Sequence, residues 1–226
     1  MKREIVLDTE TTGLDPLSGH RMAEIGCVEL VGGVRTGAFF HTYLNPERDM
    51  PPEAFRVHGL SSQFLADKPI FAQKIDEFLE FVADSTLVIH NAAFDMKFVN
   101  FEVMRLGFAA LSMDRIVDTM LIARKKFPGS PSSLDALCKR FNIDLSGRTK
   151  HGALLDAELL ADVYLDLLGG RQKALILDGS KQSTTSSNIA SKEKRFLEPR
   201  SFPISTEEEE AHKAMLGKLK NPIWAA

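Results

Sequence analysis

Two acidic residues near the N-terminus, Asp8 and Glu10, stand at the end of an apolar run, Ile5-Val6-Leu7, that is typical of a buried β-strand. Residues two apart in a strand project to the same face, so we expect the two carboxylates side by side. Two such charges about 4 Å apart repel by roughly 4 kcal/mol at an effective dielectric near 20. A divalent cation that prefers oxygen ligands would remove this repulsion. The alternative is a pair of solvated carboxylates where the strand frays.

Two further acids stand where ligands often bind in α/β proteins. Asp95 is expected in the first turn of a helix that follows a short strand, although it could equally serve the helix dipole. Asp156 falls among leucines near the start of the last long helix, where a carboxylate needs a partner or a metal. His151 lies five positions upstream, and a neutral imidazole is a suitable general base near pH 7. A capping or surface histidine is the simpler alternative.

Together, the four carboxylates indicate a binding site for metal ions, which none of them indicates alone. Four converging acids would repel one another strongly without cations. Two Mg²⁺ or Mn²⁺ ions about 3.5–4 Å apart would stabilise them, which is the arrangement used for phosphodiester chemistry. Arg148 and Lys150, just before the histidine, could contact phosphates or could equally be solvated.

The elements that must position these residues follow an α/β pattern. Three apolar segments, at about residues 5–7, 23–31 and 34–44, predict antiparallel strands, and Gly32-Gly33 is a hairpin signal. A proline-containing loop is expected over residues 45–68. Helical spacing then alternates with short apolar runs, which predicts a mixed five-stranded sheet flanked by helices. The expected helices are 70–83, 94–106, 119–127, 133–140 and 152–168, and the expected later strands are 86–89 and 116–117.

Composition is that of an ordinary globular protein. The chain has 226 residues and a net charge of −3, so any nucleic acid must be met by a local patch or by metal ions. Cys27 and Cys138 lie within apolar segments and are expected to be buried thiols of a reducing compartment. The sequence shows no signal-peptide pattern and no apolar run of membrane-spanning length, which predicts a cytoplasmic protein.

The character of the chain changes after Gly170. Residues 178–194 are dominated by polar side chains and are expected to form a flexible linker. Ser205 or Thr206 should then cap a helix with an acidic first turn that ends near Asn221. We interpret this tail, with the only tryptophan of the chain, as a partner-binding peptide, with a disordered terminus as the alternative.

Three motifs of the chain resemble those of a known family, the DEDDh 3'–5' exonucleases. The motifs are Asp8 to Leu14 (DTETTGL), His90 to Asp95 (HNAAFD), and the pair His151 and Asp156. More narrowly, the chain resembles the proofreading subunits of bacterial DNA polymerase III over about residues 3–170. The stretches that carry this closer similarity are 52–60, 127–129, 133–138 and 151–157.

The resemblance implies a ribonuclease H-like fold and a site for two divalent cations, Mg²⁺ or Mn²⁺. It implies that Asp8, Glu10 and Asp156 hold the first cation, that Asp8 also contacts the second, and that Asp95 acts largely through water. His151 would deprotonate the attacking water. The products would be nucleoside 5'-monophosphates released from mispaired primers.

The resemblance also implies which residues contact the single-stranded 3' end of the DNA. Thr9, Glu53 and His58 match family positions near the terminal nucleotide, together with the metal-binding acids Asp8, Glu10 and Asp156. Without the resemblance, Glu53 and His58 are a loop acid and a loop histidine that make local hydrogen bonds. Asp118 has no place in the three motifs, and we interpret it as a helix N-cap.

The resemblance predicts three parts of the chain and the partners of two of them. Residues 1–170 would be the exonuclease domain, 171–204 the linker, and 205–226 the tail that binds the polymerase alpha subunit. Within the linker, residues 172–177 resemble peptides that bind the bacterial sliding clamp, through Gln172, Leu175 and Leu177. The alternative is a segment that packs on the domain. A small stabilising third subunit is also compatible with the resemblance.

Two other functions stay open on the sequence. One is an RNA exonuclease of the same superfamily, which would not need the tethered tail. The other is a non-catalytic scaffold that joins a clamp to a polymerase, which would not need the four acids and His151.

Overall fold

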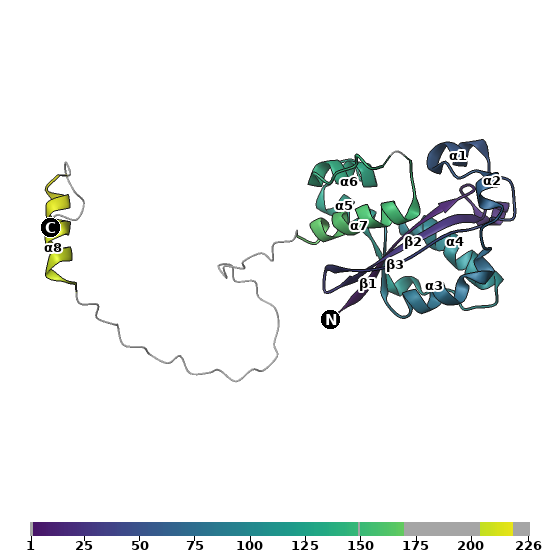
Figure 1. Ribbon diagram of the computed structural model, residues 1–226, viewed down its shortest axis with the longest axis horizontal. Coiled ribbons are helices and arrows are strands. Elements are labelled where there is room, and N and C mark those ends of the chain that lie inside the picture. Colours follow the sequence, from purple (N-terminus) through teal and green to yellow (C-terminus); the bar gives the residue numbers. More distant parts are fainter. Residues whose placement is uncertain (1, 149, 170–203, 219–226) are drawn as a thin grey trace, which may run out of the picture. The chain divides into compact units, whose positions relative to one another are not determined.

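A mixed sheet of five strands forms the centre of the larger of the two units of the protein. The computed structural model describes residues 2–148, 150–169 and 204–218 (Figure 1). The strand order is β3-β2-β1-β4-β5. The pairs β1–β2 and β2–β3 are antiparallel, whereas β1–β4 and β4–β5 are parallel, so the predicted sheet is confirmed. The strands are β1 Arg3–Thr11, β2 Met22–Val31, β3 Val34–Tyr43, β4 Thr86–Ile89 and β5 Ile116–Asp118.

The predicted hairpin between β2 and β3 is also confirmed. Gly32 and Gly33 have φ angles of 60° and 79°. Two consecutive positive φ angles match a type I′ turn, whose twist suits the flanking strands and which glycine adopts without steric penalty.

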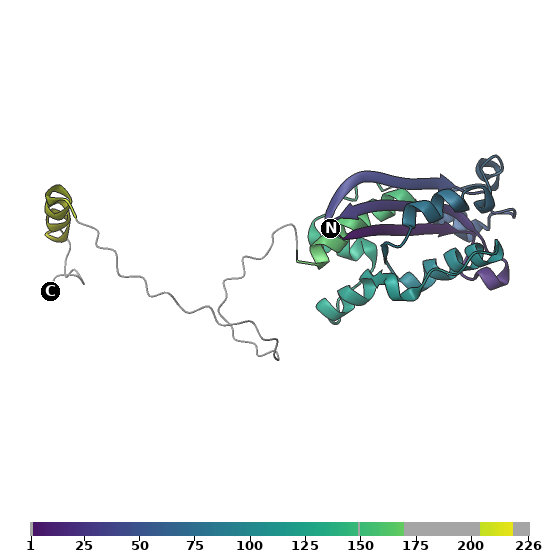
Figure 2. The same ribbon diagram turned by 90° about the horizontal axis from the view of Figure 1, so that it is seen from below.

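Helices cover both faces of the sheet (Figures 1 and 2). The α-helices of this unit are α1 Pro52–His58, α2 Ser62–Leu65, α3 Ile75–Val82, α4 Ala92–Arg105, α5 Thr119–Lys126, α6 Leu134–Phe141 and α7 Ala153–Leu167. Single turns of 3₁₀ helix are η1 Pro16–Ser18, η2 Phe71–Gln73 and η3 Met113–Arg115. Among the described residues, no helix combines the length and the apolar character needed to cross a bilayer.

Alternation along β1 divides the core into two layers. Ile5 and Leu7 pack with the side chains of α3 and α4, such as Phe78 and Phe98. Val6 faces the opposite way and packs with side chains of α5, α6 and α7. The same alternation directs residues 8 and 10 to one face, as the sequence predicted, and this face is the one that α7 covers.

The region predicted as a loop over residues 45–68 contains two short helices, so that prediction was wrong in part. α1 begins at Pro52, where the fixed φ of proline suits the first helical position, and it ends at Gly59, which has a φ of 77°. Ser61 caps α2 by accepting a hydrogen bond from the Phe64 amide. Seven- and four-residue helices are too short for hydrophobic periodicity to reveal them.

The N-terminus of α4 is capped by a residue from another strand. Asn91 occupies the cap position in a left-handed conformation, but its side chain makes no cap hydrogen bond. Asp118 at the end of β5 accepts hydrogen bonds from the amides of Asn91 and Ala92, and it also caps α5 through Met120 and Leu121. The prediction of Asp118 as an N-cap is confirmed. Asn91 occupies the N-cap position of α4, but the side chain of Asp118 accepts the hydrogen bonds there.

Helix α7 lies in direct contact with the backbone of β2. A β-carbon placed on Gly26 would lie 2.4–2.5 Å from backbone atoms of Ala153 and Leu154. Real β-carbons do not approach backbone atoms this closely, so only glycine permits the contact. The first turn of α7 is therefore held directly on β2.

The second unit of the described chain is α8, Thr206–Leu216. Ser205 and Glu208 form a capping box, with Ser205 Oγ accepting from the Glu208 amide and Glu208 accepting from the Ser205 amide. The predicted cap and acidic first turn are confirmed. The predicted clamp-binding residues Gln172, Leu175 and Leu177 lie outside the described residues.

We expect Gly26→Ala to destabilise the protein, because the added methyl group would push α7 away from β2. Overpacking of this kind lowers the free energy of unfolding by about 2 kcal/mol. Urea unfolding followed by circular dichroism measures this change. Gly147→Ala is the matched control, since a β-carbon there meets no atom within 4 Å. Equal midpoints for the two variants would contradict the close contact.

Candidate active site

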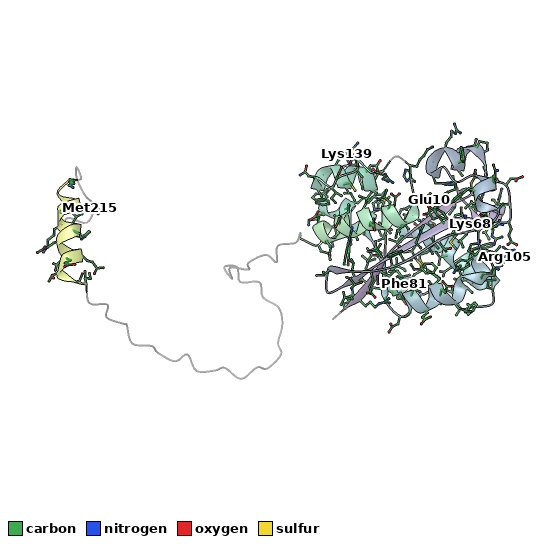
Figure 3. The ribbon with its side chains drawn as sticks, viewed as in Figure 1. Glu10, Lys68, Phe81, Arg105, Lys139 and Met215 are labelled. Atoms are coloured by element: carbon green, nitrogen blue, oxygen red, sulfur yellow. The ribbon has the colours of Figure 1, made fainter. Side chains whose placement is uncertain are left out.

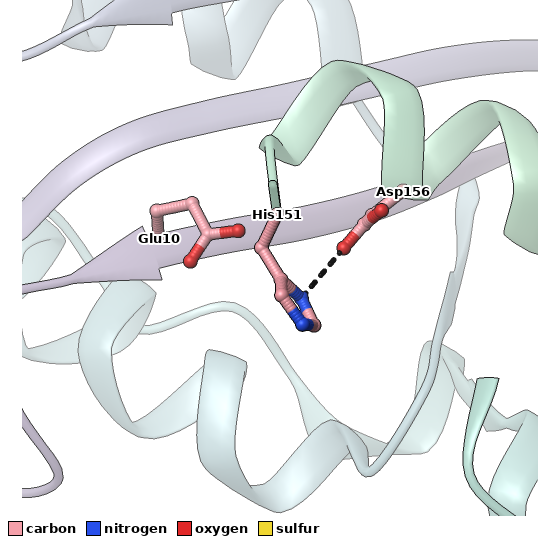
Figure 4. A group of neighbouring side chains, drawn as sticks. All are labelled: Glu10, His151 and Asp156. Carbon is pink, nitrogen blue, oxygen red and sulfur yellow. Dashed lines mark hydrogen bonds and ion pairs between the residues drawn. The ribbon is translucent and has the colours of Figure 1, made fainter. Parts of the chain in front are cut away.

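Three of the predicted side chains meet at the end of β1. Glu10 comes from β1, His151 from the loop before α7, and Asp156 from the first turn of α7 (Figures 3 and 4). One possible ligand atom of each lies within 4.8 Å of the other two. Nδ1 of His151 is 3.1 Å from Oδ2 of Asp156. Carboxylate and imidazole donors at this spacing can bind a divalent cation.

Asp95 reaches the same region from α4. Its Oδ1 accepts hydrogen bonds from the Thr9 amide at 3.1 Å and from the Thr9 hydroxyl at 2.7 Å. The pairing of β4 with β1 covers only Glu4 to Val6, so the strand edge near Thr9 is free for this contact. The buried carboxylate is thereby fixed against the strand that carries Asp8 and Glu10.

Electrostatics link Asp8 to the other acids. Burial, and then the charges of Asp95, Glu10, Asp156 and Glu24, raise the pKa of Asp8 well above its ordinary value. Burial and the charges of the neighbouring acids raise the pKa of Glu10 to about 8. Burial raises the pKa of Asp95 to about 7, although the hydrogen bonds from Thr9 oppose the shift. All three carboxyl groups therefore favour their protonated forms in the metal-free protein.

Asp156 is shifted in the opposite direction. Burial raises its pKa, but hydrogen bonds from His151 and Arg148, together with their charges, outweigh burial and leave the pKa below its ordinary value. Nε and Nη2 of Arg148 lie 2.5 Å and 2.6 Å from the two oxygens of Asp156. The carboxylate of Asp156 is therefore ionised, because a cation of the chain already pairs with it.

A fifth acid, Glu24, belongs to the cluster and was not predicted from the sequence. It lies on β2 directly opposite Glu10, and it is buried. Its Oε1 is 2.7 Å from Nε2 of His41, which lies on β3. The available signal was a charged residue that alternates with Ala23 and Ile25 within an apolar strand. Its position beside Glu10 depends on strand register, which the sequence pattern does not fix.

A cavity of about 630 Å³ opens beside Glu10. Its volume is in the range of small-molecule pockets. Among the predicted substrate residues, Thr9, Glu10, Glu53 and His58 line it, whereas Asp8, Asp156 and His151 do not. Glu10 thus belongs both to the cavity and to the acidic cluster. The side chain of Glu53 is 76% exposed and lies 3.5 Å from the guanidinium of Arg56.

His58 lines this cavity with an imidazole ring whose tautomer is fixed by the backbone. Its Nδ1 accepts from the Leu60 amide at 3.0 Å, which places the proton of the neutral ring on Nε2. Nε2 is buried and has no hydrogen-bond partner of good geometry in the described part of the chain. The backbone of Thr11 raises the pKa of the ring, because it stabilises the charged form. Burial outweighs this effect and lowers the pKa of His58, so the ring is neutral at pH 7.

Comparison with known proteins gives the class of protein that this fold and site define. A family model described as Exonuclease matches residues 5–164. A solved structure of exonuclease X in complex with 5' overhanging duplex DNA is 25% identical, with a TM-score of 0.57, over 73% of this chain and 90% of that chain. A structure of exonuclease I has a TM-score of 0.64 at 17% identity, covering 74% of this chain and 41% of that one, and supports the fold alone. The chain has the ribonuclease H-like fold and belongs to the exonuclease family.

More similar relatives narrow the assignment to DNA polymerase III subunit epsilon. The relative from Rickettsia conorii is 59% identical over 175 residues, which cover 76% of each chain. The relative from Escherichia coli is 44% identical over 242 aligned positions, which cover 99% of this chain and 98% of that one. Within the exonuclease family the chain therefore groups with the epsilon subunits and is a 3'–5' exonuclease. Membership in this family implies DNA binding, a polymerase complex and divalent metal ions.

The metal-free protein should lose stability as the pH rises towards about 8. The pKa of Glu10 in the folded state, about 8, exceeds its ordinary value of 4.5, so the folded state binds this proton more tightly than the unfolded state. The resulting stability is complete below pH 4.5 and is lost as the pH rises through about 8. Asp95 contributes with the same sign through its pKa of about 7.

Urea unfolding in EDTA at pH 6 and pH 8.5 tests this expectation. Glu10→Gln should show a smaller loss of unfolding free energy between the two pH values than the wild type. Glu80→Gln, which replaces an exposed acid on α3, is the control and should follow the wild type. The interpretation fails if Glu10→Gln and the wild type lose equal stability.

Proposed function

We propose that this exonuclease hydrolyses the 3'-terminal phosphodiester of mispaired primers with two divalent cations and a histidine base, and releases nucleoside 5'-monophosphates. The observation that supports the mechanism best is the meeting of Glu10, His151 and Asp156 within 4.8 Å. Asp8 and Asp95, whose pKa values are raised beside them, complete an oxygen-rich set of donors. Such a set suits Mg²⁺ or Mn²⁺.

In this proposal, Asp8, Glu10 and Asp156 would hold the first cation, Asp8 would also contact the second, and Asp95 would act through water. The bound cations would stabilise the negative charge that develops on the phosphate and on the leaving 3'-oxygen. The carboxylates bind them in ionised form, so loading releases the protons that Asp8, Glu10 and Asp95 favour in the metal-free protein.

His151 acts as the general base at Nε2. Its ring is partly exposed, with 47% of its side chain accessible, so a water can reach it. Oδ2 of Asp156 lies 3.1 Å from Nδ1 of the ring, and a hydrogen bond donated by Nδ1 to Asp156 would leave the lone pair of Nε2 for the proton of the attacking water. The backbone amide of His151 donates a hydrogen bond to the Val57 carbonyl of α1 at 3.3 Å, which holds the loop before α7 against α1.

The cavity beside Glu10 receives the 3'-terminal nucleotide of single-stranded DNA. Thr9 lies along the nucleotide, and Glu53 and His58 bind it from α1. His58 is suited to this task because its ring lines the cavity and, in its neutral form, carries the proton on Nε2. Together with the acids Asp8, Glu10 and Asp156, these residues place the terminal phosphodiester beside His151.

The C-terminal part of the chain serves assembly. Residues 1–170 form the exonuclease domain, 171–204 the linker and 205–226 the segment that binds the polymerase alpha subunit. Ile204, just before the acidic first turn of α8, and Met215, in its last turn, expose apolar side chains, which fits a segment that folds against a partner. Residues 172–177, outside the described residues, are proposed to bind the sliding clamp, and a small third subunit would stabilise the domain.

We expect His151→Gln to lower kcat by about 10²–10⁴-fold, because general-base catalysis contributes roughly this much. The measurement is release of nucleoside 5'-monophosphates from a primer with a mismatched 3' end, with Mg²⁺ present. Mn²⁺ binding measured by calorimetry should stay close to that of the wild type. If His151 is a metal ligand instead of a base, the same variant will bind Mn²⁺ weakly.

The variant Asp156→Asn is measured in the same two assays, nucleotide release and Mn²⁺ calorimetry. It should abolish both Mn²⁺ binding and nucleotide release, since it removes the charge of a metal ligand. An RNA oligomer with the same 3' end should be a poorer substrate of the wild type. Full activity of Asp156→Asn would contradict the mechanism.

Deletion of residues 205–226 should abolish the complex with the polymerase alpha subunit and leave exonuclease activity intact. The reason is that α8 forms a unit of its own, while the acids and the cavity all belong to the first unit. Gel filtration of the mixed subunits measures the complex, and the primer assay measures the activity. Coelution of the truncated chain with the polymerase subunit would place the contact elsewhere.

A further inference from the structure

Arg148 occupies the position of a cation within the acidic cluster. It lies in the loop between α6 and α7, and only 8% of its side chain is exposed. Its Nε and Nη2 pair with both oxygens of Asp156, at 2.5 Å and 2.6 Å. Nη1 pairs with Asp135 in the first turn of α6. A guanidinium forms its strongest pairs in this forked geometry.

This arrangement conflicts with the binding of a metal ion at Asp156. A bidentate guanidinium directs two N–H groups at the lone pairs that face the centre of the carboxylate. A cation held jointly by Glu10 and Asp156 needs an oxygen of the same carboxylate. It would also place two or more positive charges beside the guanidinium, which is unfavourable.

The same guanidinium also contacts His151. Its Nη2 lies 2.8 Å from Nδ1 of the ring. Arginine can only donate, so this contact requires Nδ1 to accept and places the ring proton of a neutral histidine on Nε2. In that tautomer Nε2 has no lone pair for a water proton. The contact of Nδ1 with Asp156, at 3.1 Å, requires the opposite tautomer, with Nε2 free.

Asp135 offers the guanidinium a second partner. Its side chain is 52% exposed, so it is more open to solvent than Asp156, of which 4% is exposed. Arg148 can give up Asp156 and still be paired with a carboxylate. The loop that carries it lies immediately before the predicted base.

We propose that Arg148 is a built-in competitor of the metal ion: it fills the cation position at Asp156 in the metal-free protein, and when metal binds it releases Asp156 and keeps only its pair with Asp135. This inference rests on the proposed metal site at Asp156. Departure of the guanidinium also lets Nδ1 of His151 donate to Asp156. Arg148 is thus a positioning residue that couples metal loading to the tautomer of the base.

Calorimetric titration of the full chain with Mn²⁺ tests the proposal on four proteins: wild type, Arg148→Lys, Arg148→Met and the control Lys150→Met. Both Arg148 variants should bind Mn²⁺ on the order of tenfold more tightly, because each lacks the competing fork. Lys150→Met removes the same charge two residues away, where the ammonium donates to the Arg56 carbonyl, and should bind like the wild type.

Each other result overturns the proposal in a distinct way. Tighter binding by Arg148→Met alone would show that charge, and not the forked contact, is responsible. Equal or weaker binding by both Arg148 variants would show that the guanidinium supports the metal site. Absence of Mn²⁺ binding by the wild type would remove the proposed metal site itself, and this inference with it.

Thermal unfolding separates competition from a simple structural role. In EDTA, Arg148→Met should melt below the wild type, because Asp156 loses its counter-charge beside Glu10. Saturating Mn²⁺ should remove this difference, since the metal then supplies the charge. A deficit that persists unchanged in Mn²⁺ would show that Arg148 only braces the loop, and would overturn the proposal.

Discussion

The repulsion between buried carboxylates is the constraint on which the rest of this site depends. Asp8 and Glu10 share one face of β1, and Asp156 of α7 and Glu24 of β2 lie close enough to raise their pKa values. A folded chain can hold such a group only with protons, with an internal cation or with metal ions. The free energy needed to assemble the group comes from the two apolar layers that fix the sheet and its helices.

The sheet brings these residues together through two special contacts. Gly26 lets the first turn of α7 lie directly on β2, which holds Asp156 beside Glu10. The early end of the β1–β4 pairing frees the edge of β1 near Thr9, where Asp95 binds. The first contact lies on the antiparallel part of the sheet, and the second lies where the parallel pairing of β1 with β4 ends. The chemistry of the site is therefore a consequence of where pairing stops as much as of which residues are present.

Much of this could be predicted from the sequence, because it depends on local pattern. Alternation placed Asp8 and Glu10 on one face, and the glycine pair gave the hairpin. The role of Glu24 could not be predicted, since it depends on the register of β2 against β1. The short helices α1 and α2 were missed because a few residues carry no periodicity. The position of Arg148 was left open because a loop arginine has many partners within its reach, and only the folded chain selects Asp156.

Two different kinds of positive partner relieve the repulsion within the acidic cluster, namely protons and a guanidinium. Asp8, Glu10 and Asp95 favour protons, as their raised pKa values show, whereas Asp156 favours the guanidinium of Arg148 and stays ionised. A proton is displaced by raising the pH, but a guanidinium is always charged and has to move. The two halves of the cluster should therefore respond to different variables, one to pH and the other to the freedom of the loop before α7. The cations of the proposed mechanism would have to replace both the protons and the guanidinium.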